Sequence, residues 1–158
     1  MIVPLTAACL MAAATGYGLP PGAMTAILAV EGGKVGQAVS NKNGSQDLGP
    51  FQINSVWLDS FKTYWRLPDR ATAERLLRDD GCANAWAAAA ILKSHLIYTG
   101  RIDRAIARYH SATPPIGAAY LEKVSAAARK QFCEGPAGKQ PAYASYCLTA
   151  ATPARRSP

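Results

Sequence analysis

The stretch AILAVEGG, residues 26–33, is an apolar run that ends in one carboxylic acid and two glycines. It predicts a helix over residues 23–31, which the glycine pair ends because glycine adopts the positive φ favoured at a helix C-terminus. Ile27 and Leu28, one turn earlier, lie on the same side of this helix as Glu31. We therefore expect the Glu31 carboxyl group to contact apolar surface.

Two effects raise the pKa of Glu31 in this prediction. Burial against apolar side chains disfavours the carboxylate, and the negative end of the helix dipole disfavours it again. A carboxylic acid that stays protonated near neutral pH is the general acid that glycosidic cleavage requires. An ordinary surface glutamate is the alternative, and helix position alone favours it.

The segment that follows is polar, and a sugar-binding loop is one interpretation of it. Residues 34–49 are rich in Gly, Asn and Ser, which predicts a loop. Residues 41–54 read NKNGSQDLGPFQIN, and such amides can hydrogen-bond sugar hydroxyl and N-acetyl groups. A solvated surface loop is the alternative, which composition alone favours. Asp47 is the nearby candidate for a second carboxylate, but its Gly and Ser neighbours indicate that it folds the loop by bonding the backbone.

Helices account for most of the remaining chain. Ala-rich composition, few β-branched runs and Pro or Gly stops favour an α-helical protein. Helices are also predicted over residues 4–15, 55–65, 72–80, 84–98, 102–110 and 117–132. The length of 158 residues suits one domain. We therefore expect an all-α single domain of about six or seven helices over residues 1–132, followed by a Pro/Ala/Gly-rich tail over residues 133–158.

The charge distribution and the N-terminal segment limit the partners. The formal net charge is +7, which favours an anionic partner, but the basic residues are scattered, so we expect no nucleic-acid binding. Gly16 and Pro20 interrupt the apolar N-terminal run before it reaches spanning length, so we expect no stable membrane span. No Lys or Arg precedes Lys34, so we expect the native export signal to lie outside this sequence.

The four cysteines favour disulfides over a metal site. The chain has no CxxC motif and two histidines, so we expect no metal. Two disulfides in an oxidising compartment explain the count, and four buried free thiols are the alternative. Four cysteines allow three connectivities, and their spacing does not choose among them.

Several blocks resemble the soluble-type lytic transglycosylases of the goose-type lysozyme superfamily. AILAVEGG resembles the family's apolar helix ending in Glu, and NGSQDLGPFQINSVWL, residues 43–58, resembles its G-L-M-Q-I-N-S motif. CANAWAAAAILKSHL, residues 82–96, resembles its Cys-containing helix. AIARYHSA, residues 105–112, stands where the family has A-x-A-Y-N-A-G, and Tyr120 with Val124 matches a Tyr-x-x-x-Val pattern. The resemblance covers roughly residues 9–130 and points to the small specialised members of conjugation and type III and IV secretion systems.

The resemblance implies a lysozyme-like fold and a reaction. Glu31 would protonate the bond between N-acetylmuramic acid (MurNAc) and N-acetylglucosamine (GlcNAc). As a base it would then help the sugar's 6-hydroxyl group close a 1,6-anhydro ring, with no cofactor. Tyr109 would hydrogen-bond or position Glu31, Gln52 and Ser40 would contact the glycan, and Tyr120 would line the cleft. Core packing is the alternative for both tyrosines, because they lie on apolar helical faces.

Three departures from the family pattern bear on the substrate rather than on the acid. Gly32 replaces the usual Ser, Pro50-Phe51 replaces Leu-Met, and His110-Ser111-Ala112 replaces Asn-Ala-Gly. Because the family's Asn contacts substrate, we expect His110 at a substrate-binding position.

The resemblance also implies a Cys9–Cys82 bridge, and we expect Cys133–Cys147 as the second. We expect a periplasmic monomer that binds peptidoglycan and serves a secretion or conjugation apparatus. The alternatives are a hydrolytic goose-type lysozyme, which uses water, and a catalytically impaired, peptidoglycan-binding assembly factor.

Overall fold

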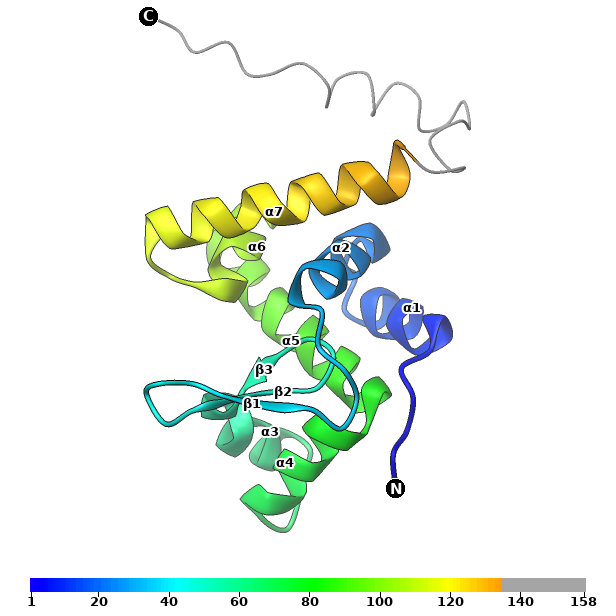
Figure 1. The fold of residues 1–158 in the computed structure, drawn as a ribbon, viewed down its shortest axis with the longest axis vertical. Helices are drawn as coiled ribbons and strands as arrows, with labels where there is room; N and C mark the ends of the chain where they lie inside the picture. Colours follow the sequence, from blue (N-terminus) through cyan, green and yellow to red (C-terminus); the bar gives the residue numbers. More distant parts are fainter. Residues whose placement is uncertain (135–158) are drawn as a thin grey trace, which may run out of the picture.

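In the computed structural model, which describes residues 1–134, seven α-helices form most of the fold (Figure 1). The helices are α1 (Ala7–Gly16), α2 (Pro21–Glu31), α3 (Leu58–Tyr64), α4 (Arg70–Asp79), α5 (Gly81–Thr99), α6 (Ile102–His110) and α7 (Pro114–Phe132). This confirms the predicted all-α fold of six or seven helices. A small antiparallel sheet lies at one side, beside α4 and α5 (Figure 1). The division into a domain and a tail stays a prediction, because most of residues 133–158 lie outside the described part.

Helix α5 is the central element. It packs against α1, α4 and α6, while α7 lies across α2 and α6 (Figure 1). Its alanines at 85 and 87–89 are wholly buried, so neighbouring helices approach it closely. The contact between α2 and α7 brings the end of one helix beside the first half of the other, and this contact forms the site described below.

Capping explains where the helices begin and end. The Asp80 side chain accepts hydrogen bonds from the backbone N–H groups of Cys82 and Ala83 at the start of α5. Gly32 ends α2 with a φ of 63°, in the left-handed region that glycine tolerates best. The predicted start of the last helix at residue 117 treats Pro114 and Pro115 as a separator between two helices. They instead occupy the first turn of α7, where a missing N–H costs nothing.

The predicted loop over residues 34–49 is partly wrong. The structure has three short strands there and just beyond, β1 (Ala38–Ser40), β2 (Gln46–Leu48) and β3 (Ile53–Asn54), which pair in the order β1-β2-β3. Strands of two or three residues carry no readable alternation of polar and apolar side chains, so periodicity does not reveal them.

Asp47 holds this sheet together through side chains. Its carboxylate oxygens accept hydrogen bonds from the amide nitrogens of Asn41 (3.0 Å) and Asn54 (2.8 Å). The expected loop-folding role therefore rests on side-chain amides, whereas the sequence suggested backbone bonds.

The expected Cys9–Cys82 disulfide joins α1 to α5, with a distance of 5.2 Å between the Cα atoms. The second expected bridge, Cys133–Cys147, involves a residue outside the described part of the chain. Within residues 1–134, no helix is long and apolar enough to cross a membrane.

Candidate active site

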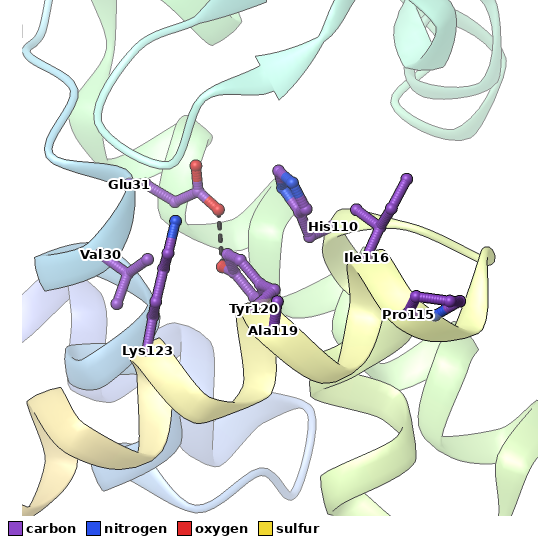
Figure 2. A pocket seen from close by; sticks show the side chains of 8 residues that line it. All are labelled: Val30, Glu31, His110, Pro115, Ile116, Ala119, Tyr120 and Lys123. Carbon is purple, nitrogen blue, oxygen red and sulfur yellow. Dashed lines mark hydrogen bonds between the residues drawn. The ribbon is translucent and has the colours of Figure 1, made fainter.

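Glu31 is the last residue of α2 and is half-buried. The Tyr120 hydroxyl group, from α7, donates a hydrogen bond of 2.6 Å to Glu31 Oε1 (Figure 2). Burial raises the pKa of Glu31, the Tyr120 hydrogen bond opposes this effect, and the Asp47 charge adds to it. The carboxyl group therefore favours its protonated form more than an exposed glutamate does, as the sequence predicted.

The loop over residues 49–52 closes against the end of α2. A side chain at Gly33 would collide with the Gly49 carbonyl oxygen and the Gln52 amide, so only glycine allows this approach. Gln52 adopts a positive φ of 49°, which is strained for a residue with a side chain. Its amide nitrogen donates a hydrogen bond of 2.8 Å to the Gly49 carbonyl, so part of the side chain's hydrogen-bonding capacity maintains the loop.

Asn84, on α5, holds the other side of this loop and is wholly buried. Its Oδ1 accepts a hydrogen bond from the Phe51 N–H (2.8 Å), and its Nδ2 donates to the carbonyl groups of Leu48 (2.9 Å) and Leu77 (2.8 Å). Asn84 was not predicted from the sequence. A single amide in the apolar, Ala-rich first half of this helix was the signal that could have identified it, because buried amides need partners.

Two tyrosines and a histidine form a stack beside Glu31. The ring of Tyr120 lies parallel to that of His110, with centroids 4.6 Å apart, and near that of Tyr109 at 6.5 Å. Burial and the nearby charge of Glu31 raise the pKa of Tyr120 well above its ordinary value, so its hydroxyl group remains a proton donor to Glu31.

The two tyrosine hydroxyl groups have different hydrogen-bond partners. The hydrogen bond to Glu31 comes from Tyr120, whereas the Tyr109 hydroxyl group donates to the Phe51 carbonyl at 3.2 Å. Tyr109 still lies close enough to Glu31 for its charge to raise the Tyr109 pKa, after the larger effect of burial. Both tyrosines pack in the interior and also contribute a hydroxyl group to the site.

Two pockets meet at Glu31 and His110. The α7 pocket has a volume of about 470 Å³ and is lined by Val30, Glu31, His110, Pro115, Ile116, Ala119, Tyr120 and Lys123 (Figure 2). The sheet pocket has a volume of about 280 Å³ and is lined by Glu31, Asp47, Gln52, Ile53, Asn54, Trp57, Ile91, Tyr109 and His110. A chain-like ligand that occupied both pockets would pass over the Glu31 carboxyl group.

These pockets bring together most of the predicted site residues. Gln52, Tyr109 and His110 line the sheet pocket with Glu31, and Tyr120 lines the α7 pocket. Ser40 is the exception, since it lies exposed at the end of β1, paired with Gln46, and lines neither pocket.

The lining residues that were not predicted include Asn54, Trp57 and Lys123. The asparagine and the tryptophan belong to the quoted motif block, so their place in that block was the available signal. Lys123 follows Tyr120 by one helical turn, and this spacing alone would have placed it on the same face.

The chemistry of the site is that of a single half-buried acid with a fixed hydroxyl partner. Asp47 shares the sheet pocket with Glu31, but both of its carboxylate oxygens accept amide hydrogen bonds. No cluster of three or more His, Cys, Asp or Glu side chains is placed to hold a metal ion within residues 1–134.

Comparison with known proteins identifies the family. The model of the transglycosylase SLT domain matches residues 8–132, which is most of the chain and includes every residue of both pockets. A search among curated proteins finds no match. The chain therefore belongs to the transglycosylase SLT domain family and is a lytic transglycosylase of the lysozyme-like superfamily, which acts on peptidoglycan.

Proposed function

We propose that this enzyme cleaves the β-1,4 bond between MurNAc and GlcNAc and releases 1,6-anhydro-MurNAc ends, with Glu31 as both acid and base. One observation carries the proposal: Glu31 is the carboxyl group that lines both pockets, and burial raises its pKa. A glycan that spans the two pockets would present its scissile bond to this group.

The proposed reaction has two proton transfers. Protonated Glu31 gives its proton to the glycosidic oxygen as the bond from that oxygen to the MurNAc anomeric carbon breaks. The Glu31 carboxylate then takes the proton of the MurNAc 6-hydroxyl group as its oxygen bonds the anomeric carbon. The acid is regenerated and no water is consumed. Because Tyr120 donates to Oε1, Oε2 is the oxygen that would exchange the proton.

The proposed substrate contacts follow the lining of the sheet pocket. One N–H of the Gln52 amide donates to the Gly49 carbonyl, and the rest of this amide suits sugar hydroxyl and N-acetyl groups. The Trp57 ring suits the apolar face of a pyranose, and Tyr109 and His110 also belong to this lining. A glycan contact by Ser40 would lie outside both pockets, at the exposed end of β1.

Analysis of peptidoglycan digests by mass spectrometry tests the reaction, since an anhydro end is lighter than a hydrated end by one water. We expect anhydro products, and we expect Glu31→Gln to lower the rate about 10²- to 10⁴-fold, the usual contribution of a general acid or base. The amide still accepts the Tyr120 hydrogen bond, so the fold should persist. Glu122→Gln, an exposed carboxyl group on α7, is the matched control and should keep the wild-type rate. Unchanged activity in Glu31→Gln would refute the assignment.

A hydrolytic, goose-type lysozyme is the second candidate function. The observation that favours it is that Asp47 lines the same pocket as Glu31, which would give water a second carboxylate. Hydrated products alone, together with a large loss of activity in Asp47→Asn, would establish it. A peptidoglycan-binding factor without activity is the remaining alternative, and any cleavage by the wild type excludes it.

The proposed site of action is the periplasm, where local opening of the wall would admit a secretion or conjugation apparatus. The Cys9–Cys82 disulfide suits an oxidising compartment, and the net charge of +7 suits the anionic wall. Cell fractionation and co-purification with the apparatus test these points. We also propose a monomer with a catalytic domain over residues 1–132 and a tail over residues 133–158. Size-exclusion chromatography and truncation after residue 132 test that organisation.

A further inference from the structure

The Lys123 side chain is a positive charge without a partner at the edge of the α7 pocket. It extends from α7 alongside Tyr120, and its Nζ atom turns to the same side as the Glu31 carboxyl group (Figure 2). Among the described residues, the ion pairs are made by Arg70, Arg78 and Arg101, and none includes Lys123. An anionic group of a ligand could therefore bind this ammonium group without displacing a protein carboxylate.

The remainder of the α7 pocket is largely apolar. Val30, Pro115, Ile116 and Ala119 supply aliphatic surface, and the exposed Ala119 lies one helical turn before Lys123. An ammonium group beside exposed aliphatic surface suits a short arm that carries a methyl group and a carboxylate. The sheet pocket differs, since Asp47, Gln52 and Asn54 give it a polar lining with no ammonium group.

We propose that the α7 pocket receives the lactyl arm of MurNAc, with Lys123 as the residue that binds its carboxylate. This inference rests on the proposed function, because it assumes that the scissile bond lies at Glu31. The lactyl methyl group contacts the Ala119 side chain, one helical turn before Lys123, and the carboxylate pairs with Lys123 Nζ. GlcNAc lacks this arm, so the pocket selects MurNAc for the α7 side of the cleavage point.

The carboxylate has two possible sources in peptidoglycan. In glycan stripped of peptide, the lactyl group itself carries it. In intact muropeptides the lactyl carboxyl group is bound in an amide, and the peptide attached to it supplies the carboxylates. Both sources present the same chemistry to Lys123, and the choice of ligand separates them.

Binding to the full chain with Glu31→Gln, which prevents turnover, tests the proposal by calorimetry. The ligands are a GlcNAc–MurNAc tetrasaccharide, the same tetrasaccharide with peptides, and a GlcNAc tetrasaccharide, which has no lactyl arm. Adding Lys123→Gln should weaken binding of a carboxylate-bearing ligand by about twofold to fivefold, within the range for a solvent-exposed ion pair. Binding of the GlcNAc tetrasaccharide should not change, and Lys123→Arg should retain the wild-type affinity.

Lys130→Gln is the matched control. Lys130 is exposed on the same helix, seven residues beyond Lys123, which is about 10 Å along the axis. Lys130→Gln makes the same change in charge outside the pocket and should leave the affinities for all three ligands unchanged. A larger loss with the peptide-free tetrasaccharide assigns the lactyl carboxylate, and a larger loss with the peptide-bearing ligand assigns the peptide.

Two results would overturn the inference. One is unchanged affinity of Lys123→Gln for both carboxylate-bearing ligands, and the other is an equal loss for all three ligands. Kinetics distinguish this failure from failure of the proposed function. With Glu31 intact, Lys123→Gln should raise KM, leave kcat near wild type and still release anhydro ends. If the wild type releases none, the proposed reaction itself fails, whatever Lys123 does.

Discussion

Replacing Asn84 with alanine is expected to destabilise the protein strongly. The Asn84 side chain is wholly buried on α5 and makes three hydrogen bonds, of 2.8, 2.9 and 2.8 Å, to backbone groups of Phe51, Leu48 and Leu77. These residues belong to β2, to the loop over residues 49–52 and to α4, so the amide joins three segments to the central helix. The alanine variant loses all three hydrogen bonds at once and leaves the three backbone groups without their partner.

The size of the effect follows from the groups left behind. A buried donor or acceptor without a partner costs about 1–3 kcal/mol. Carbonyl oxygens lie at the lower end of that range, because they have a second lone pair and tolerate under-satisfaction better than an N–H group. One N–H and two carbonyl groups then cost about 3–5 kcal/mol in total. That loss is a large part of the 5–15 kcal/mol typical of a folded domain.

Urea unfolding at 25 °C, followed by circular dichroism at 222 nm, measures this change in the free energy of unfolding. Ser94→Ala is the control on the same helix, since its exposed hydroxyl group bonds only the Ile91 carbonyl of its own helix. We expect that control to lie within about 0.5 kcal/mol of the wild type. A loss below about 1 kcal/mol in Asn84→Ala, with an unchanged urea dependence, would refute the reasoning.

Three further predictions concern the acid and the disulfide. Tyr120→Phe removes a hydrogen-bond donor that favours the Glu31 carboxylate, so the pKa of Glu31 rises further. The alkaline limb of the plot of kcat/KM against pH should therefore move to higher pH, and kcat should fall about tenfold to a hundredfold. Glu31 has a raised pKa in the folded state, so its contribution to stability is complete below about pH 4.5 and is lost as pH rises through the folded pKa. Glu31→Gln should therefore gain stability relative to the wild type at pH 8 but not at pH 4, and an equal difference at both would contradict this. The Cys9–Cys82 disulfide joins residues 73 apart in the sequence, so its reduction should lower the free energy of unfolding by about 4 kcal/mol, measured in urea. An unchanged urea midpoint would contradict a stabilising disulfide.

The helical part of the fold could be predicted because its signals are local. Apolar spacing and glycine stops predicted the observed bounds of α6, Ile102–His110. For α2 the predicted range differs from the structure only at the first residues. The errors lie at the first turns. Proline was interpreted as a separator before α7, although its fixed φ also suits a first helical turn, and only tertiary contacts decide between these uses.

The small sheet could not be predicted from the sequence in the same way. Asp47 accepts hydrogen bonds from Asn41, which the turn at Gly44 brings close, and from Asn54, which the turn over residues 49–52 brings close. Polar residues with glycine describe a loop and a short polar hairpin equally well. The difference is made by side-chain hydrogen bonds between residues that composition does not pair.

The acid itself could be predicted, but its partner could not. The position of Glu31 at the end of an apolar helix indicated a buried carboxyl group, and burial is the largest influence on its pKa. The choice between Tyr109 and Tyr120 as its hydrogen-bond donor depends on how α6 and α7 cross. Helix periodicity places both tyrosines on inward faces and does not say which hydroxyl group reaches Oε1.

The stack beside Glu31 links the protonation of the acid to the central helix. The Phe51 N–H donates a hydrogen bond to Asn84 Oδ1, which fixes the Phe51 backbone. The Phe51 carbonyl in turn accepts a hydrogen bond from the Tyr109 hydroxyl group. Tyr109 packs near Tyr120, whose hydroxyl group is the donor to Glu31. A substitution that loosens Phe51 therefore changes the position of Tyr109 first, and the geometry of the Tyr120–Glu31 bond next. The pH profile of Asn84 variants that remain folded should consequently shift in the same direction as that of Tyr120→Phe, because both weaken the bond that favours the carboxylate.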